Sequence, residues 1–130
     1  MRWKLTHIYG MDIGENVRIS RKAELDYSRN PRGIHIGDNT SVTGYVIVLT
    51  HDQLNGRLED VYIGSNCFIG TGSIILPGVR IGDHVVIGAG SVVSKDIPSH
   101  CVAVGNPARI IRKDISLSND SHFINHGERV

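Results

Sequence analysis

The fold is decided by the stretch "IGSNCFIGTGSIILPGVRIGDHVVIGAGSVV", residues 63–93, in which an aliphatic residue returns at every sixth position. The same step of six occurs earlier in the chain, and glycine follows the aliphatic residue in half of these hexads. A fixed period over most of a chain is typical of repeat architectures, in which each unit packs on its neighbours. The aliphatic positions are Ile13, Ile19, Leu25, Ile36, Val42, Val48, Ile63, Ile69, Ile75, Ile81, Ile87 and Val93.

A period of six predicts a coil with three flat sides. Each hexad supplies a short strand whose aliphatic residue points inward, and glycine allows the corner that follows. Three hexads complete one turn, and successive turns stack about 4.8 Å apart. A sandwich of hairpins would instead show alternation of period two with turn pairs. We therefore expect an all-β parallel β-helix of about four coils over residues 13–98.

The two ends of the chain lack the period. Residues 1–12 are expected to cap the first coil, so that its edge does not pair with other chains. Residues 99–130 are expected to close the last coil, and the polar stretch after Lys113 to form a tail that is partly helical or disordered.

The period fails at two places inside the coil. Leu25 and Ile36 are eleven residues apart, and Val48 and Ile63 are fifteen residues apart. Both gaps follow the third hexad of a turn, so both inserts leave the coil at about the same corner. Such insertions form loops on one face, often the binding face. The larger insert, residues 50–61, carries a histidine at its start, His51.

Composition excludes several classes of function. Lys and Arg number 14 against 13 Asp and Glu, so no overall positive charge favours nucleic acid or an anionic membrane. No apolar run is long enough for a membrane span or a signal peptide, so we expect a cytoplasmic protein. The two cysteines lack the spacing of metal ligands and are expected to be reduced thiols.

The stretch "IGSNCFIGTGSIILPGVRIGDHVVIGAGSVVSKDIP", followed by "VAVGNPARIIRK", resembles the hexapeptide-repeat acyltransferases. Members of this family have a left-handed parallel β-helix, and the handedness is taken from the resemblance alone. The resemblance also implies a homotrimer without metal that uses acetyl-CoA as co-substrate and has active sites between neighbouring subunits.

Within the family, "IGDNTSVTGYVIVLTHD", residues 36–52, is most similar to the sugar O-acetyltransferases of the maltose, galactoside and capsular polysaccharide type. In that group a histidine follows a strand and opens a loop. The resemblance implies acetylation of a sugar hydroxyl in polysaccharide or surface-glycan biosynthesis. N-acetylation of an amino sugar or a nucleotide-linked amino sugar is the alternative.

The resemblance also assigns residues to roles. His51 is the general base, a role that suits histidine because imidazole has a neutral form near pH 7. Asp26, at the start of the smaller insert, contacts the acceptor sugar. The residues assigned to acetyl-CoA are Thr71, Ala89, Ser94 and Lys95, with Arg109 and Arg112 on its phosphates, which the guanidinium fork fits. The histidines expected to be exposed and without a special role are His7, His35, His84, His100, His122 and His126.

Two other functions are weighed against this one. The zinc carbonic anhydrases of the same fold need three histidines around a metal, usually including two histidines five positions apart, and no such pair occurs. A scaffold without catalytic activity is the third possibility, and His51 together with the acetyl-CoA type of C-terminal sequence argues against it.

Overall fold

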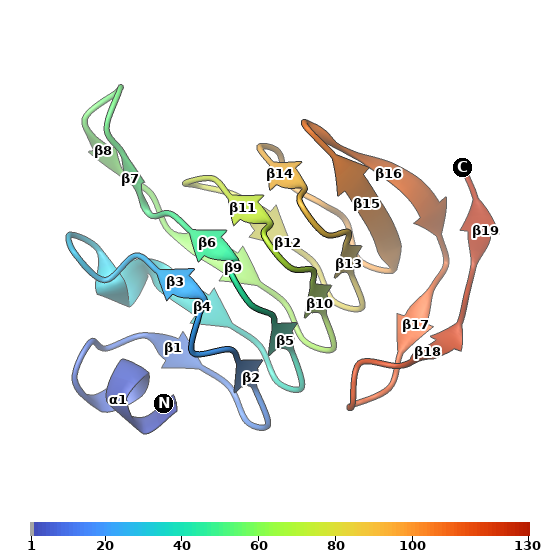
Figure 1. Cartoon of the computed structure of the whole chain (residues 1–130), viewed down its shortest axis with the longest axis horizontal. Coiled ribbons are helices and arrows are strands. Elements are labelled where there is room, and N and C mark those ends of the chain that lie inside the picture. The colour runs from blue at the N-terminus through green and yellow to red at the C-terminus, as the bar shows by residue number, and fades with distance from the viewer. Residues whose placement is uncertain (1) are drawn as a thin grey trace.

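The computed structural model describes residues 2–130, which wind into four complete coils and part of a fifth (Figure 1). Each coil contributes one short strand to each of three parallel sheets, because the chain turns a corner after every hexad. Sheet 1 contains β1 (Asp12–Ile13), β4 (Ile34–Ile36), β9 (Val61–Ile63) and β12 (Arg80–Ile81). Sheet 3 contains β3 (Glu24–Leu25), β6 (Ile47–Val48), β11 (Ile74–Ile75) and β14 (Val92–Val93).

Sheet 2 extends beyond the coils at the C-terminal end. Its parallel strands are β2 (Arg18–Ile19), β5 (Ser41–Val42), β10 (Phe68–Ile69), β13 (Val86–Ile87) and β15 (Cys101–Gly105). Two antiparallel strands follow, β16 (Ala108–Lys113) and β19 (Glu128–Arg129). The partial fifth coil pairs with the fourth through a bridge between Ile97 and Ile81.

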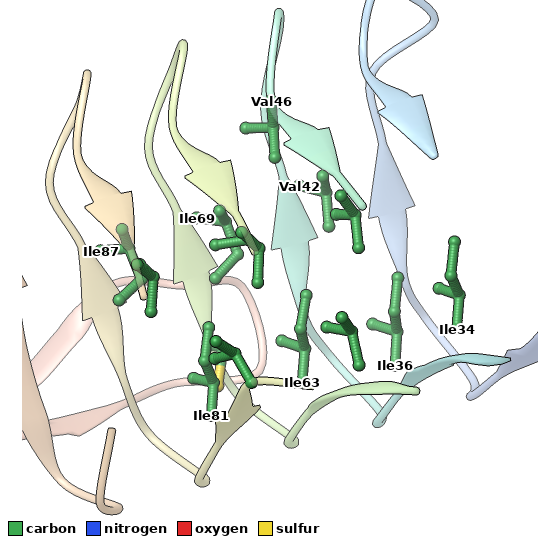
Figure 2. Close-up of a cluster of buried hydrophobic side chains, with 14 of the residues drawn as sticks. Ile34, Ile36, Val42, Val46, Ile63, Ile69, Ile81 and Ile87 are labelled. Atoms are coloured by element: carbon green, nitrogen blue, oxygen red, sulfur yellow. The ribbon is translucent and has the colours of Figure 1, made fainter. Parts of the chain in front are cut away.

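The strand registers place the aliphatic residues of successive coils directly beside one another. In sheet 1, Ile13 pairs with Ile36, Ile36 with Ile63, and Ile63 with Ile81. Figure 2 shows such side chains pointing from neighbouring coils into the space between the sheets. All twelve aliphatic positions of the repeat are buried except Ile19, which packs against the core while partly exposed. The predicted parallel coil is therefore confirmed.

Hydroxyl and thiol side chains fill the second inward position of several hexads. The buried hydroxyls of Thr40 and Ser73 donate to the backbone carbonyls of Gly64 and Gly70, at 2.7 and 2.8 Å. Burial raises the pKa of the Cys67 thiol to about 12, so this cysteine stays protonated and unreactive. The core thus tolerates polar atoms because each finds a backbone partner.

The N-terminal end and the inserts add the other elements. The helix α1 (Arg2–His7) packs on β1, with Leu5 buried. The smaller insert contains the 3₁₀ turn η1 (Pro31–Gly33). The larger insert forms a hairpin of β7 (His51–Asp52) and β8 (Arg57–Leu58), which projects from the coil in Figure 1. Among residues 2–130 no helix is both long and apolar enough to cross a membrane.

The segment after Lys113 corrects the prediction of a partly helical or disordered tail, because residues 114–130 form short strands joined by turns and contain no helix. It contains β17 (Ser116–Leu117) and β18 (Phe123–Asn125), an antiparallel pair, before β19. Residues 115–121, here called the C-terminal strap, run back along one corner of the coils. The strap accepts hydrogen bonds from His100 (to Ile115 O, 2.9 Å), Asn66 (to Asn119 Oδ1, 3.0 Å) and Arg18 (to Ser121 Oγ, 2.8 Å), and Leu117 N–H donates to His84 Nδ1 (3.0 Å).

Candidate active site

The two inserts begin on adjacent coils at the same corner, between sheet 3 and sheet 1. Asp26 follows β3, which pairs with β6, and its N–H donates to Val48 O at 2.9 Å. Thr50, the buried residue before His51, directs its N–H at Asp26 Oδ2, 3.5 Å away. The corner predicted from the spacing of the hexads therefore brings Asp26 close to His51.

The carboxylate of Asp26 is ionised. Ser28 donates to Asp26 Oδ1 from its N–H at 3.2 Å and from its hydroxyl at 2.7 Å. Partial burial raises the pKa of Asp26, but the hydrogen bonds from Ser28 and Thr50 and the charge of the nearby His51 ring together lower it below its ordinary value. An anion at this place stabilises a positive charge on the imidazole and can accept a hydrogen bond from a hydroxyl group.

The backbone of the hairpin holds His51 at the start of β7. His51 pairs with Leu58 across the hairpin. The turn that joins β7 to β8 is fixed by Asp52, which accepts from Asn55 N–H at 3.1 Å and from Asn55 Nδ2 at 2.7 Å. Within residues 2–130 no group forms a hydrogen bond to the half-buried His51 ring, so its nitrogens are open to a substrate proton.

A cavity opens beside Asp26 at the N-terminal end of the coil. Its volume is about 620 Å³, and its wall combines residues of α1, β3 and β6 with residues of the segments that follow these elements. The rings of Tyr9 and Tyr27 stack at its edge with centroids 4.7 Å apart. The sequence repeat did not predict this cavity, because part of the cavity wall comes from the N-terminal segment and the smaller insert, which lie outside the repeat.

Four of the residues assigned to acetyl-CoA flank sheet 3, two on each edge. Thr71 and Ala89 are exposed on adjacent coils at the corner between sheets 2 and 3. Ser94 and Lys95 are exposed directly after β14, at the corner of the inserts. Thr71 and Ala89 therefore lie at the edge of sheet 3 opposite to His51, and a single chain does not bring all of these residues together.

The outer face of sheet 3 lies between these two edges. Its outward positions, one in each coil, are Glu24, Ile47, Ile74 and Val92. Three of the four are aliphatic and only half-buried. An apolar strip bordered by small residues suits a narrow, flexible ligand.

A β-bulge places both arginines on the same face of β16. Arg109 pairs with Val104 and Arg112 pairs with Val102, which leaves Ile111 without a partner between them. Because Val102 and Val104 are two residues apart, they face the same side of the sheet, and so do the arginines opposite them. Arg112 also donates from Nη1 to His126 O at 3.2 Å.

Two of the remaining histidines differ from the prediction of exposed rings without a special role, and a third, His100, is exposed as predicted but bonds to the C-terminal strap. His35 is half-buried and lies between two carboxylates, those of Asp12 and Asp60. His84 is half-buried, stacks on His100 and accepts a hydrogen bond from the C-terminal strap. Within residues 2–130, no three His, Cys, Asp or Glu side chains are grouped so that they could hold a metal ion.

Comparison with known proteins shows the family. A profile for the bacterial transferase hexapeptide (six repeats) matches residues 60–95. A maltose O-acetyltransferase from Clostridium difficile 630 is 36% identical, with 78% of this chain and 68% of that chain covered and a TM-score of 0.60. A galactoside acetyltransferase in complex with coenzyme A is 32% identical, with 92% and 72% covered and a TM-score of 0.63. The chain belongs to the hexapeptide-repeat acyltransferase family.

Family membership confirms the expected fold class, a left-handed parallel β-helix. Protein CapG from Staphylococcus aureus is another similar protein, 40% identical over 114 residues, which cover 79% of this chain and 66% of CapG. The chain spans about two thirds or less of the length of the curated relatives that it matches.

Proposed function

We propose that this hexapeptide-repeat protein is an acetyl-CoA-dependent O-acetyltransferase that acts on a sugar hydroxyl in polysaccharide or surface-glycan biosynthesis, in the cytoplasm. The observation that carries the proposal is the corner where His51 lies near Asp26, which borders the 620 Å³ cavity, while no group within residues 2–130 forms a hydrogen bond to the His51 ring. The maltose and galactoside acetyltransferases among the similar proteins support a sugar as the acceptor.

The chemistry follows from the two side chains at this corner. Acetyl-CoA would supply the acetyl group as a thioester. His51 takes the proton of the attacking sugar hydroxyl while the hydroxyl oxygen bonds to the carbonyl carbon of the acetyl group. When the carbon–sulfur bond breaks, the imidazolium returns this proton to the sulfur, so no covalent acyl-enzyme is needed. Asp26 contacts the sugar and stabilises the transient charge on the imidazolium.

The outer face of sheet 3 and the arginines of β16 fit the co-substrate. The aliphatic strip of Ile47, Ile74 and Val92 offers an apolar track for the pantetheine arm, with Thr71, Ala89, Ser94 and Lys95 at its edges. Arg109 and Arg112 face the same side of sheet 2 and would hold the phosphates through guanidinium hydrogen bonds.

A homotrimer would complete this site. The outward positions of sheet 1 are polar or aromatic, namely Asp12, His35, Tyr62 and Arg80. Those of sheet 3 are mainly aliphatic, which suits a face that another copy covers. In such an assembly the edge with Thr71 and Ala89 of one subunit would face the edge with His51 of the next. Residues that lie apart in one chain would then share one acetyl-CoA molecule.

The decisive experiment measures thiol release from acetyl-CoA with a panel of neutral sugars, oligosaccharides, nucleotide sugars and amino sugars. We expect release with a sugar that has free hydroxyl groups, and a product whose acetyl group hydroxylamine removes as an ester. An amide product formed only with amino sugars would favour N-acetyl transfer instead. Absence of both acetyl-CoA binding and thiol release across the panel would refute the proposal.

A further inference from the structure

The closing end of the larger insert is fixed by the carboxylate of Asp60. Its Oδ1 accepts a hydrogen bond from Asn30 Nδ2 at 3.2 Å, and its Oδ2 lies 3.1 Å from His35 Nε2. Asn30 and His35 both come from the second coil and the insert that precedes it. We call these three residues the Asp60 clamp.

Asn30 joins the two ends of the insert. Its backbone carbonyl accepts a hydrogen bond from the Thr50 hydroxyl at 3.2 Å, while its side chain holds Asp60. The two ends are also joined directly, because Glu59 N–H donates to Thr50 O at 2.9 Å. The residue next to His51 and the residue that closes the insert therefore share one partner.

Gly33 leaves the space that this arrangement needs. A Cβ atom at this position would lie 2.7 Å from Asp60 Oδ1 and closer still to the side-chain amide of Asn30. Gly33 is buried and does not have a positive φ, so the close approach rather than an unusual backbone conformation explains the glycine. The smaller insert is built around the contact with Asp60.

His35 is itself fixed by the coil. Its Nδ1 lies 3.0 Å from Asp12 Oδ2, and its ring stacks on Tyr62 with centroids 4.2 Å apart and planes 4° from parallel. The guanidinium of Arg80 lies 4.0 Å from the centroid of the Tyr62 ring. The hydrogen bonds from His35 and Asn30 hold the pKa of Asp60 below its ordinary value, so the Asp60 carboxylate is ionised near neutral pH.

We propose that the Asp60 clamp positions His51 for the acetyl transfer, an inference that rests on the proposed function. The hairpin of the insert has only two residues in each strand, and Leu54 at its turn is 99% exposed. A hairpin of this size is marginally stable alone. The position of His51 therefore depends on the two ends of the insert, and Asn30 and Asp60 hold these ends together. A shift of the base by about 1 Å can reduce the rate about 100-fold.

The test compares Asp60→Ala with the matched control Asp12→Ala. Each substitution removes one carboxylate from the His35 ring, but only Asp60 belongs to the insert. We expect Asp60→Ala to lower kcat about 10- to 100-fold, to leave the KM for acetyl-CoA unchanged and to speed amide hydrogen exchange at residues 51–59. Asp12→Ala should change kcat less than about twofold and leave this exchange unchanged. Asn30→Ala, which keeps the carbonyl that binds Thr50, should shift both quantities in the direction of Asp60→Ala.

Hydrogen exchange makes the two proposals separable, because it needs no substrate. Unchanged exchange at residues 51–59 in Asp60→Ala would overturn the clamp whatever the activity. Faster exchange with an unchanged kcat would show that the clamp holds the insert without positioning His51, and would overturn the proposed role. A wild-type protein that acetylates no acceptor would refute the proposed function itself.

Discussion

Replacing His51 by alanine should separate catalysis from stability. Loss of a general base costs about 10²- to 10⁴-fold in kcat, which corresponds to about 2.7–5.5 kcal/mol of transition-state stabilisation. The His51 ring forms no hydrogen bond within residues 2–130, and the hairpin lies outside the core of stacked aliphatic residues. The free energy of unfolding should therefore change by only about 0.5 kcal/mol, and Tm by a few degrees at most. Thiol-release kinetics and thermal melting measure the two effects on the same sample.

The matched control is Leu58→Ala, which truncates the residue paired with His51 on the same hairpin and leaves the base intact. Leu58 is 54% exposed, so its loss should affect neither folding nor the imidazole. The reasoning fails if His51→Ala melts more than about 10 °C earlier, or if Leu58→Ala lowers kcat as much as His51→Ala does. Unchanged acetyl-CoA affinity in His51→Ala, measured by calorimetry, would show that the co-substrate still binds.

Three further outcomes test the phosphate site, the core and the charge of the clamp. Alanine at both Arg109 and Arg112 should raise the KM for acetyl-CoA about 10-fold or more with little change in kcat, and calorimetry should show wild-type affinity weakening as salt increases. Ile69→Ala, which truncates a fully buried side chain of sheet 2, should cost about 2–5 kcal/mol in urea unfolding. The pKa of Asp60 is lowered from 3.8, so the ionised carboxylate stabilises the folded state above pH 3.8, and this stabilisation is lost as the pH falls through the lowered pKa. The difference in urea midpoint between wild type and Asp60→Ala should therefore disappear at such low pH.

The repeating part of the fold could be predicted because each hexad encodes its own orientation. An aliphatic residue at every sixth position defines which side chain points inward, and residues such as Ile36 and Ile63 pair where the period places them. The positions of the two gaps, each after the third hexad of a turn, also predicted the corner where Asp26 and His51 meet. These inferences need only local spacing along the chain.

The contacts that depend on distant parts of the chain could not be predicted in this way. The period marks His35 only as an outward residue, whereas its partners Asp12 and Asp60 lie 23 and 25 positions away along the chain. Arg109 and Arg112 are an odd number of residues apart, which in a regular strand would put them on opposite faces. Only the bulge at Ile111 brings both arginines to one face, and the spacing of the sequence does not predict a bulge.

The C-terminal strap has a consequence for how the coil comes apart. A stack of repeats in which every unit touches only its neighbours frays from either end, one unit at a time. Here Arg18 in the first coil bonds Ser121, which lies 103 positions later, and the strap bonds the third, fourth and fifth coils along the way. Neither terminal coil can peel off without releasing the strap, so the linear stack behaves as a closed loop. Its opening should be all-or-none, because the strap joins the first coil to the fifth in one cooperative unit.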